Sequence, residues 1–266
     1  MLGTPKRLQR QLPTSWEEVG AAAIACVRDL VNYPESQAKL RIISRLLKIR
    51  RATVLGMSND AIGDLYRALN WMQVNTYDAP LVPHFWHRMR RYDFLHAKFS
   101  NGKALQYPMA DEFYQQFLNS EDREPLYLLL ATLCREPGLS DQPLTRTEVE
   151  ARAKRLAALP TEIPTLAVMY WSGVKHYIDK VYGPWLWPRP EADDDDPDAD
   201  NEPQEEPSLF GWWGIYMDIA EAGVFGNLDQ VHQSNFHSIC MYLVKKKKAE
   251  QDMRRQMEFQ RLKNDH

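Results

Sequence analysis

The residues best suited to chemistry are three histidines in a short aromatic stretch. His84 and His87 stand three positions apart in HFWHR, and His96 follows nearby. On a helix, residues three apart share a face, and imidazole is a common zinc ligand. A zinc site also needs a third and a fourth ligand at comparable spacing. We interpret these histidines as surface or hydrogen-bonded residues and predict no metal site.

Two pairs of adjacent carboxylates, Asp111-Glu112 and Glu121-Asp122, are the next candidates, here for general acid–base catalysis. Adjacent residues on a helix point in different directions, so neither pair would place two carboxylates on one substrate. The sequence also lacks the motifs of phosphate-binding loops, dinucleotide sites, hydrolase nucleophiles and zinc proteases. We therefore expect a protein that is not an enzyme and that uses no cofactor.

The three cysteines are Cys26, Cys134 and Cys240, which are far apart, odd in number and without a CxxC pair. Each lies in an apolar helical context, which predicts buried free thiols and a reducing compartment. The N-terminal stretch lacks the apolar core of a secretory signal, and no uncharged apolar run is long enough to span a membrane. These features predict a cytoplasmic protein without membrane contact.

Charge is distributed unevenly along the chain. Residues 191–207 hold ten acidic and no basic residues, whereas the remainder has 33 basic and 26 acidic residues. Residues 188–207 contain no large apolar side chain, so this Pro-, Asp- and Glu-rich stretch cannot bury enough surface to fold. We predict an acidic disordered linker at 188–207, between an N-terminal domain at 1–187 and a C-terminal module at 208–266.

The N-terminal domain is expected to be multi-helical. Helix-capping residues precede a helix from about Ser15 to Val31, and the run from Pro125 to Arg135 is apolar almost all round, which predicts a central buried helix. Asn101-Gly102 between two partly apolar runs predicts a small β-hairpin near 93–107, ended by Pro108. The expected fold class is therefore mainly α, with one small hairpin.

The C-terminal module, 208–266, reads as three helices followed by a basic tail. Gly223 suits a left-handed helix stop, Asn227 suits a helix start, and Ser234 or Asn235 can cap the third helix. Aromatic residues dominate binding energy at interfaces, so five of them are candidate partner-binding residues. They are Trp212, Trp213, Tyr216, Phe225 and Phe236. The alternative interpretation is that these residues form the core of the module itself.

Four stretches resemble tail-assembly chaperones and related small proteins of tailed phages and prophages of Bacteroidetes-type hosts. They are LPTSWEEV, FSNGKALQYPMADEFYQQF, LYLLLATLCREP and GWWGIYMDIAEAGVFGNLDQVHQSNFHSICMYLVKKKKAE. The resemblance implies a non-catalytic protein of the host cytoplasm that coats the long helical tape-measure protein or contacts another tail protein. It covers under half of the chain and assigns no residue a role.

Two alternatives stay open. The basic stretch 39–51 and the tail 245–263 carry many cations, and the helices around Gly56 superficially resemble a helix-turn-helix, which would suit a nucleic-acid-binding protein. Alternating charge on an amphipathic helix and a cationic helix C-terminus explain the same residues without a ligand. The other alternative is a structural connector or minor tail protein of the particle. The sequence leaves the oligomeric state open.

Overall fold

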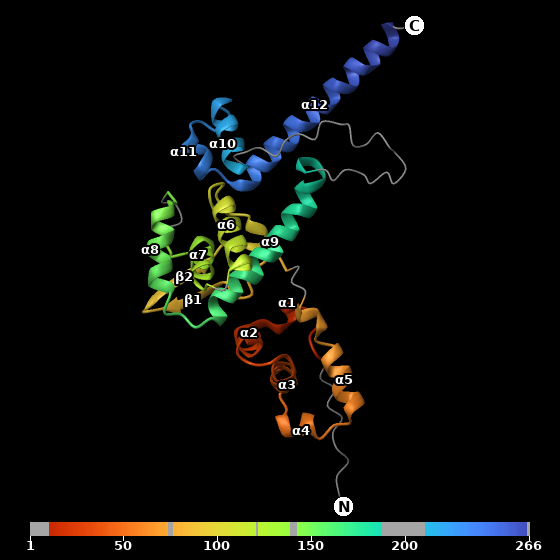
Figure 1. The fold of residues 1–266 in the computed structure, drawn as a ribbon, viewed down its shortest axis with the longest axis vertical. Helices are drawn as coiled ribbons and strands as arrows, with labels where there is room; N and C mark the ends of the chain where they lie inside the picture. Colours follow the sequence, from red (N-terminus) through yellow and green to blue (C-terminus); the bar gives the residue numbers. More distant parts are fainter. Residues whose placement is uncertain (1–10, 74–76, 121, 139–142, 188–210, 265–266) are drawn as a thin grey trace, which may run out of the picture.

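The computed structural model describes residues 11–73, 77–120, 122–138, 143–187 and 211–264. Within them the chain is mainly α-helical with one small antiparallel sheet, which confirms the predicted fold class. The N-terminal helices form one end of the molecule (Figure 1). They are α1 (Trp16–Val19), α2 (Ala23–Asn32), α3 (Glu35–Leu46), α4 (Arg51–Leu55) and α5 (Asn59–Arg67), with 3-10 turns η1 (Gly20–Ala22) and η2 (Asn70–Gln73).

The middle of the molecule is built around one apolar helix. Its helices are α6 (Gln106–Asn119), α7 (Glu124–Leu133), α8 (Arg146–Leu156) and α9 (Glu162–Leu186). Helix α7 packs against the other three, and Leu129 and Leu130 are fully buried, which confirms the predicted central helix. Helix α8 begins with a capping box, in which Thr145 and Glu148 satisfy each other's backbone N–H groups.

The β-hairpin lies earlier in the chain than predicted. Strands β1 (His84–His87) and β2 (Arg90–Phe94) pair around a two-residue turn, and β3 (Cys134–Arg135) adds to β2. Both turn residues, Arg88 and Met89, have positive φ values, 47° and 63°. This turn geometry usually calls for Asn-Gly, so the sequence at 88–89 carries no recognisable hairpin signal.

The Asn-Gly pair expected to turn that hairpin has another role. The 3-10 turn η3 (Ala97–Phe99) precedes it, and a Cβ on Gly102 would lie 2.2 Å from the Phe99 ring. The carbonyl of Gly102 accepts a hydrogen bond from Phe236 N at 3.0 Å, and Ala104 N donates to Ser234 O at 2.8 Å. The segment therefore pairs with a distant segment and not with its own neighbour. Pro108 lies within the first turn of α6.

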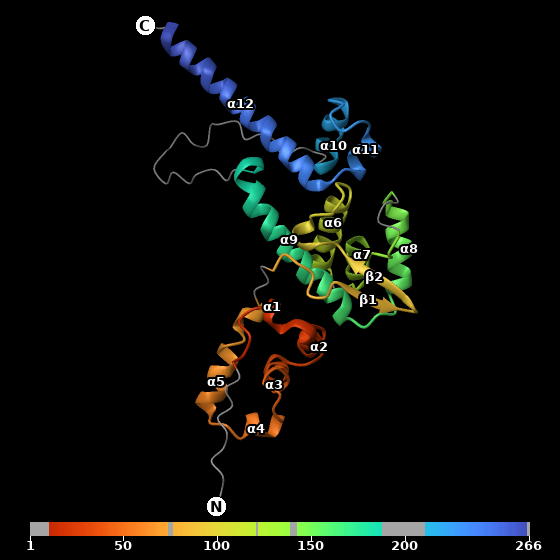
Figure 2. The same ribbon diagram turned by 180° about the vertical axis from the view of Figure 1, so that it is seen from behind.

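The C-terminal helices are α10 (Trp212–Glu221), α11 (Leu228–Gln233) and α12 (Phe236–Asn264). The predicted stop at Gly223 has a positive φ of 67°, and Asn227 forms a capping box with Gln230. The last part of α12 extends beyond the other helices in both views (Figure 2), and the side chains of residues 248–263 are exposed.

The C-terminal helices are not isolated from the rest of the molecule. Phe236 and Cys240 of α12 belong to the same buried cluster as the middle helices, and Ala104 belongs to the cluster beneath α10. The reason is that α12 offers a continuous apolar face that the middle helices cover. The division at 188–207 stays a prediction, and the predicted acidic linker lies outside the described residues.

The three cysteines are free and buried, as predicted. Burial raises the pKa of Cys26 to about 11 and those of Cys134 and Cys240 to about 12, which keeps each thiol protonated and unreactive. Among the described residues, no helix combines the length and the apolar character that crossing a bilayer requires.

Candidate functional site

Two of the five candidate partner-binding residues are inaccessible. Tyr216 and Phe236 are 0% exposed. The Tyr216 hydroxyl donates to the Ala104 carbonyl at 2.7 Å, and the Phe236 ring stacks on Tyr107 with ring centroids 4.2 Å apart. Both side chains hold the C-terminal helices against the start of α6 and the segment before it. The expectation that they contact a partner is therefore wrong for the folded chain, and the core interpretation applies to them.

Two more are partly buried among aromatic neighbours. Trp212 lies 5.2 Å, between ring centroids, from both Tyr107 and Phe236. Phe225 contacts the Tyr242 ring edge-on at 5.8 Å. Aromatic pairs in this geometry stabilise packing beyond the area they bury. Trp212 and Phe225 therefore support the local core, and they offer little surface to a partner.

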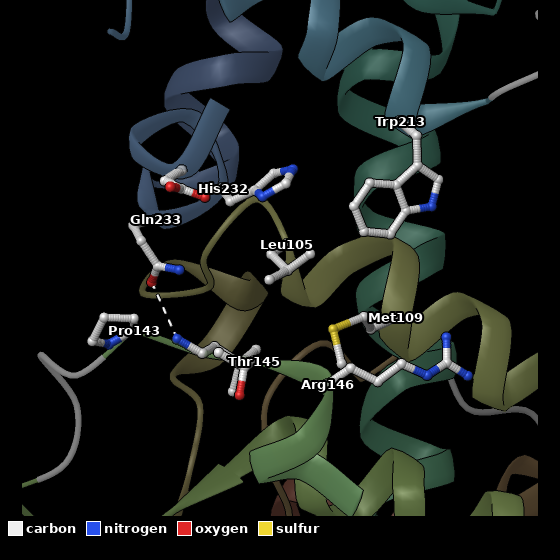
Figure 3. Close-up of a pocket in the computed structure, with 10 residues that line it drawn as sticks. Leu105, Met109, Pro143, Thr145, Arg146, Trp213, His232 and Gln233 are labelled. Atoms are coloured by element: carbon white, nitrogen blue, oxygen red, sulfur yellow. Dashed lines mark hydrogen bonds between the residues drawn. The ribbon is translucent and has the colours of Figure 1, made fainter. Parts of the chain in front are cut away.

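Trp213 differs from the other four because its side chain is 41% exposed. It lies at a cavity of about 520 Å³ between the C-terminal helices and the middle helices (Figure 3). The remaining lining residues are Leu105, Met109, Pro143, Leu144, Thr145, Arg146, Asp229, His232 and Gln233. Most of the cavity surface is apolar, although five of the ten lining side chains are polar. A cavity of this size with a mostly apolar surface is typical of a binding site.

The cavity is held open by contacts between segments distant in the sequence. Trp213 stands in the first turn of α10, and His232 and Gln233 end α11. The side-chain oxygen of Gln233 accepts from Lys103 Nζ at 2.9 Å. It also accepts from Leu144 N at 3.3 Å, the hydrogen bond that is dashed in Figure 3. These hydrogen bonds connect α11 to the segment before α6 and to the segment before α8, so they hold the walls of the cavity together.

His232 is one of three polar residues that α11 contributes to the cavity, with Asp229 and Gln233. Its ring lies edge-on to Trp213 at 5.4 Å and to Tyr216 at 5.7 Å. Burial lowers the pKa of His232, partly opposed by the nearby carboxylate of Asp229, so the ring is neutral at pH 7. Its Nε2 atom is buried and has no hydrogen-bond partner among the described residues. A neutral imidazole can either donate to or accept from a ligand.

Arg146 brings a positive charge that is already compensated. Its two Nη atoms donate to Glu112 at 3.1 and 2.8 Å, and its Nε donates to Glu150 at 3.3 Å. These contacts raise the Arg146 pKa and leave the cavity without a net attraction for anions. The chemistry of the walls therefore favours a mostly apolar group with one polar atom for His232.

The other sequence candidates are not brought together. His84 and His87 lie on strand β1, where residues three apart point to opposite faces, so the expected shared helix face is wrong. Asp111 pairs with Lys175, whereas Glu112 pairs with Arg146. Glu121 lies outside the described residues, and the described residues hold no group of three or more potential metal ligands.

Much of the basic stretch 39–51 is engaged within the molecule. Lys39 pairs with Glu35 at 2.7 Å. Arg41 and Arg45 both pair with Asp29 of α2, at 2.8 and 3.0 Å. Asp29 is 1% exposed, so this carboxylate depends on the two arginines for its compensation. Three cations of α3, the helix that suggested a nucleic-acid surface, therefore form ion pairs within the molecule.

Sequence reasoning identified Trp213 but not the rest of the cavity. Leu105, Met109 and Arg146 lie more than 60 positions before Trp213, and no local pattern connects them to it. A family alignment is the usual source of such a signal. Here no family model matches the chain, and it matches no curated protein and no solved structure.

Proposed function

We propose that this chain is a non-catalytic protein of particle assembly that binds a helical protein partner through the cavity beside Trp213. The observation that supports this is an exposed tryptophan at the rim of a cavity with mostly apolar walls, whose one arginine is already paired. Tryptophan is the residue most enriched among those that dominate interface energies. The partner would place apolar side chains in the cavity and a polar atom near His232.

The resemblance to tail-assembly chaperones suggests which partner to test. Such a protein would cover the tape-measure protein in the host cytoplasm until tail-tube subunits replace it. A long, aggregation-prone helix offers repeated apolar side chains, which matches the chemistry of the cavity walls. We therefore infer that the tape-measure protein, or another helical tail protein, is the partner.

The test is co-expression with a tape-measure protein, which the resemblance to tail-assembly chaperones implies is encoded beside this chain, followed by affinity measurement on the purified pair. Replacing Trp213 with Ala should weaken the complex at least about tenfold, as expected for a residue at an interface centre. The matched control is Trp86→Ala, because Trp86 is also an exposed tryptophan, at 64%, but lies on β1. Equal affinities of the two variants, or no complex at all, would contradict the proposal.

A structural connector or minor tail protein would use the same kind of contact. Analysis of purified particles distinguishes a connector from a chaperone, because a connector remains in the particle and a chaperone does not. The nucleic-acid alternative draws little support from α3, whose Lys39, Arg41 and Arg45 are paired within the molecule. Its remaining support comes from the tail of α12 and from the cations that follow α3, which are Lys48, Arg50 and Arg51. Gel-shift assays at low ionic strength test it, because such binding weakens steeply with salt.

A further inference from the structure

An apolar groove of about 370 Å³ lies between the end of α9 and the first half of α12. Val181 and Trp185 of α9 and Met241 and Val244 of α12 form its apolar walls. Val181, Trp185 and Met241 are 39%, 38% and 60% exposed, so these walls face solvent. None of its lining residues, all of them described, also lines the cavity beside Trp213. The groove is therefore a separate apolar surface of the kind that docks another chain.

The helix that forms one wall continues past the groove as an arm, residues 248–263, whose side chains are exposed (Figure 2). At 1.5 Å per residue the arm is about 24 Å long. Near its end, Phe259 and Leu262 are 72% and 64% exposed. Helices in proteins gain most of their stability from packing an apolar face against a neighbour. The arm thus carries apolar side chains that no other described helix covers.

A single stripe of side chains connects the groove to the end of the arm. Along α12, six residues recur at alternating intervals of four and three, which places them on one side of the helix. They are Val244, Lys248, Gln251, Arg255, Glu258 and Leu262. Alternating intervals of this kind are the pattern through which two helices pair along their lengths.

Two copies of this stripe are complementary when the helices run in opposite directions. With Val244 of one copy opposite Leu262 of the other, Lys248 of the first lies opposite Glu258 of the second. The three pairs of the stripe then recur beyond a twofold axis, so that each contact is made twice. Parallel pairing would instead place Lys248 beside Lys248 and Glu258 beside Glu258, and like charges repel. The charges of the stripe therefore favour a second copy of this chain in antiparallel alignment.

We propose that two copies of this chain associate through α12, with the arm of each copy lying in the groove of the other. Phe259 and Leu262 then cover the exposed apolar walls, and Lys248, which already lies over the Trp185 ring, meets the carboxylate of Glu258. Only the two ends of this interface are apolar, so the dissociation constant is on the order of 10 µM. The inference goes beyond the proposed function, because the groove and the cavity beside Trp213 are separate surfaces.

Sedimentation velocity of the full chain over about 1–200 µM tests the association, and a reversible shift from monomer to dimer is expected. Leu262→Ala should weaken the dimer at least about tenfold, since the truncation occurs in both copies. Met257→Ala is the matched control, because Met257 is also on the arm and 58% exposed but lies on another side of the helix. A chain that stays monomeric throughout, or equal weakening in both variants, would overturn the inference.

An exchange of charges tests the antiparallel alignment. Lys248→Glu and Glu258→Lys each place like charges opposite one another, so each should weaken the dimer at least about threefold. The double variant restores opposite charges and should recover the parent dissociation constant within about threefold. Failure of the double variant to recover would point to parallel pairing or to another surface, and it would overturn the inference whatever happens at Trp213.

Discussion

Helices α3 and α12 carry similar runs of cationic side chains, yet the two runs have different roles. On α3, Arg41 and Arg45 close over the buried carboxylate of Asp29. On α12, none of the ion pairs formed among the described residues involves Lys245 to Lys248. The difference teaches that a run of cations does not by itself indicate a binding surface. The cations that pair with carboxylates of the same chain must first be left out of the count.

The contrast has a structural cause. Helix α3 packs against α2, so its cations lie over a neighbouring helix that supplies a carboxylate. Helix α12 leaves the body of the molecule soon after Val244, so its later side chains face solvent (Figure 2). Two lysines still contact α9: Lys247 donates to the Leu186 carbonyl at 3.5 Å, and the exposed Lys248 lies with its Nζ 4.0 Å from the centroid of the Trp185 ring.

The largest effect is expected when the carboxylate on the α3 side is removed. Asp29→Ala should lower the free energy of unfolding by about 3 kcal/mol, because it leaves two arginines without their acceptor and a hole in a buried position. Asp252→Ala on α12 is the control, and it should change stability by less than about 0.5 kcal/mol. Urea denaturation of both variants measures the difference, and similar losses would remove the distinction between the helices.

A smaller loss is expected from the cationic side of the same cluster. Arg41→Ala should lower the free energy of unfolding by less than Asp29→Ala does, although Arg41 also stacks on the Tyr33 ring, 3.8 Å from its centroid. The Arg45 side chain is 41% exposed, so Arg45→Ala should lower the free energy of unfolding by less than Arg41→Ala does. A double-mutant cycle between Arg41→Ala and Asp29→Ala should show coupling, and additive losses would mean that the ion pair contributes nothing.

His232 differs from the cations of both α3 and α12, because its burial disfavours the positively charged form of the ring. Its pKa is lowered in the folded chain from an ordinary value of 6.5, so the unfolded chain binds more protons below that pH. This contribution to stability is complete above pH 6.5 and is lost as the pH falls through the lowered folded-state pKa. The loss is small because solvent screens a partly exposed ring.

The measurement compares urea midpoints at about pH 7.5 and 5.5 for the parent chain and His232→Gln. The parent should lose more stability on acidification than the variant, in which the titrating ring is gone. Asp229→Asn is a useful companion, because Asp229 opposes the pKa shift of His232. Identical pH dependence in the parent and His232→Gln would contradict the assignment of a disfavoured charge.

The smallest effect is expected on α12 itself. Lys245→Ala and Lys246→Ala should each change the free energy of unfolding by less than about 0.5 kcal/mol, since neither lysine makes an ion pair with a described residue. Lys248→Ala should cost slightly more, about 0.5 kcal/mol, through the lost contact with Trp185. Thermal unfolding resolves this order only with replicate scans. A large loss of stability in Lys245→Ala or Lys246→Ala would show that these lysines are paired within the molecule, as the cations of α3 are.

Local sequence patterns predicted most of the helices and their caps. The apolar run of α7, the capping residue Asn227 of α11 and the left-handed Gly223 are all found where the sequence indicates them. Each depends on interactions within a few residues, which a sequence displays directly. The hairpin was misplaced because Arg88 and Met89 adopt a turn that their types do not signal, while Asn101-Gly102 signals one that does not form.

The sequence by itself determined that this is a mainly helical chain with buried thiols, and that Trp213 belongs to an aromatic C-terminal segment. Only the tertiary structure decided which aromatic residue stays accessible. Tyr216 and Phe236 lie on helix faces that meet the start of α6 and the segment before it, whereas Trp213 faces a cavity. Periodicity specifies which side chains share a face, but burial depends on what that face meets, and those contacts join residues more than 100 positions apart.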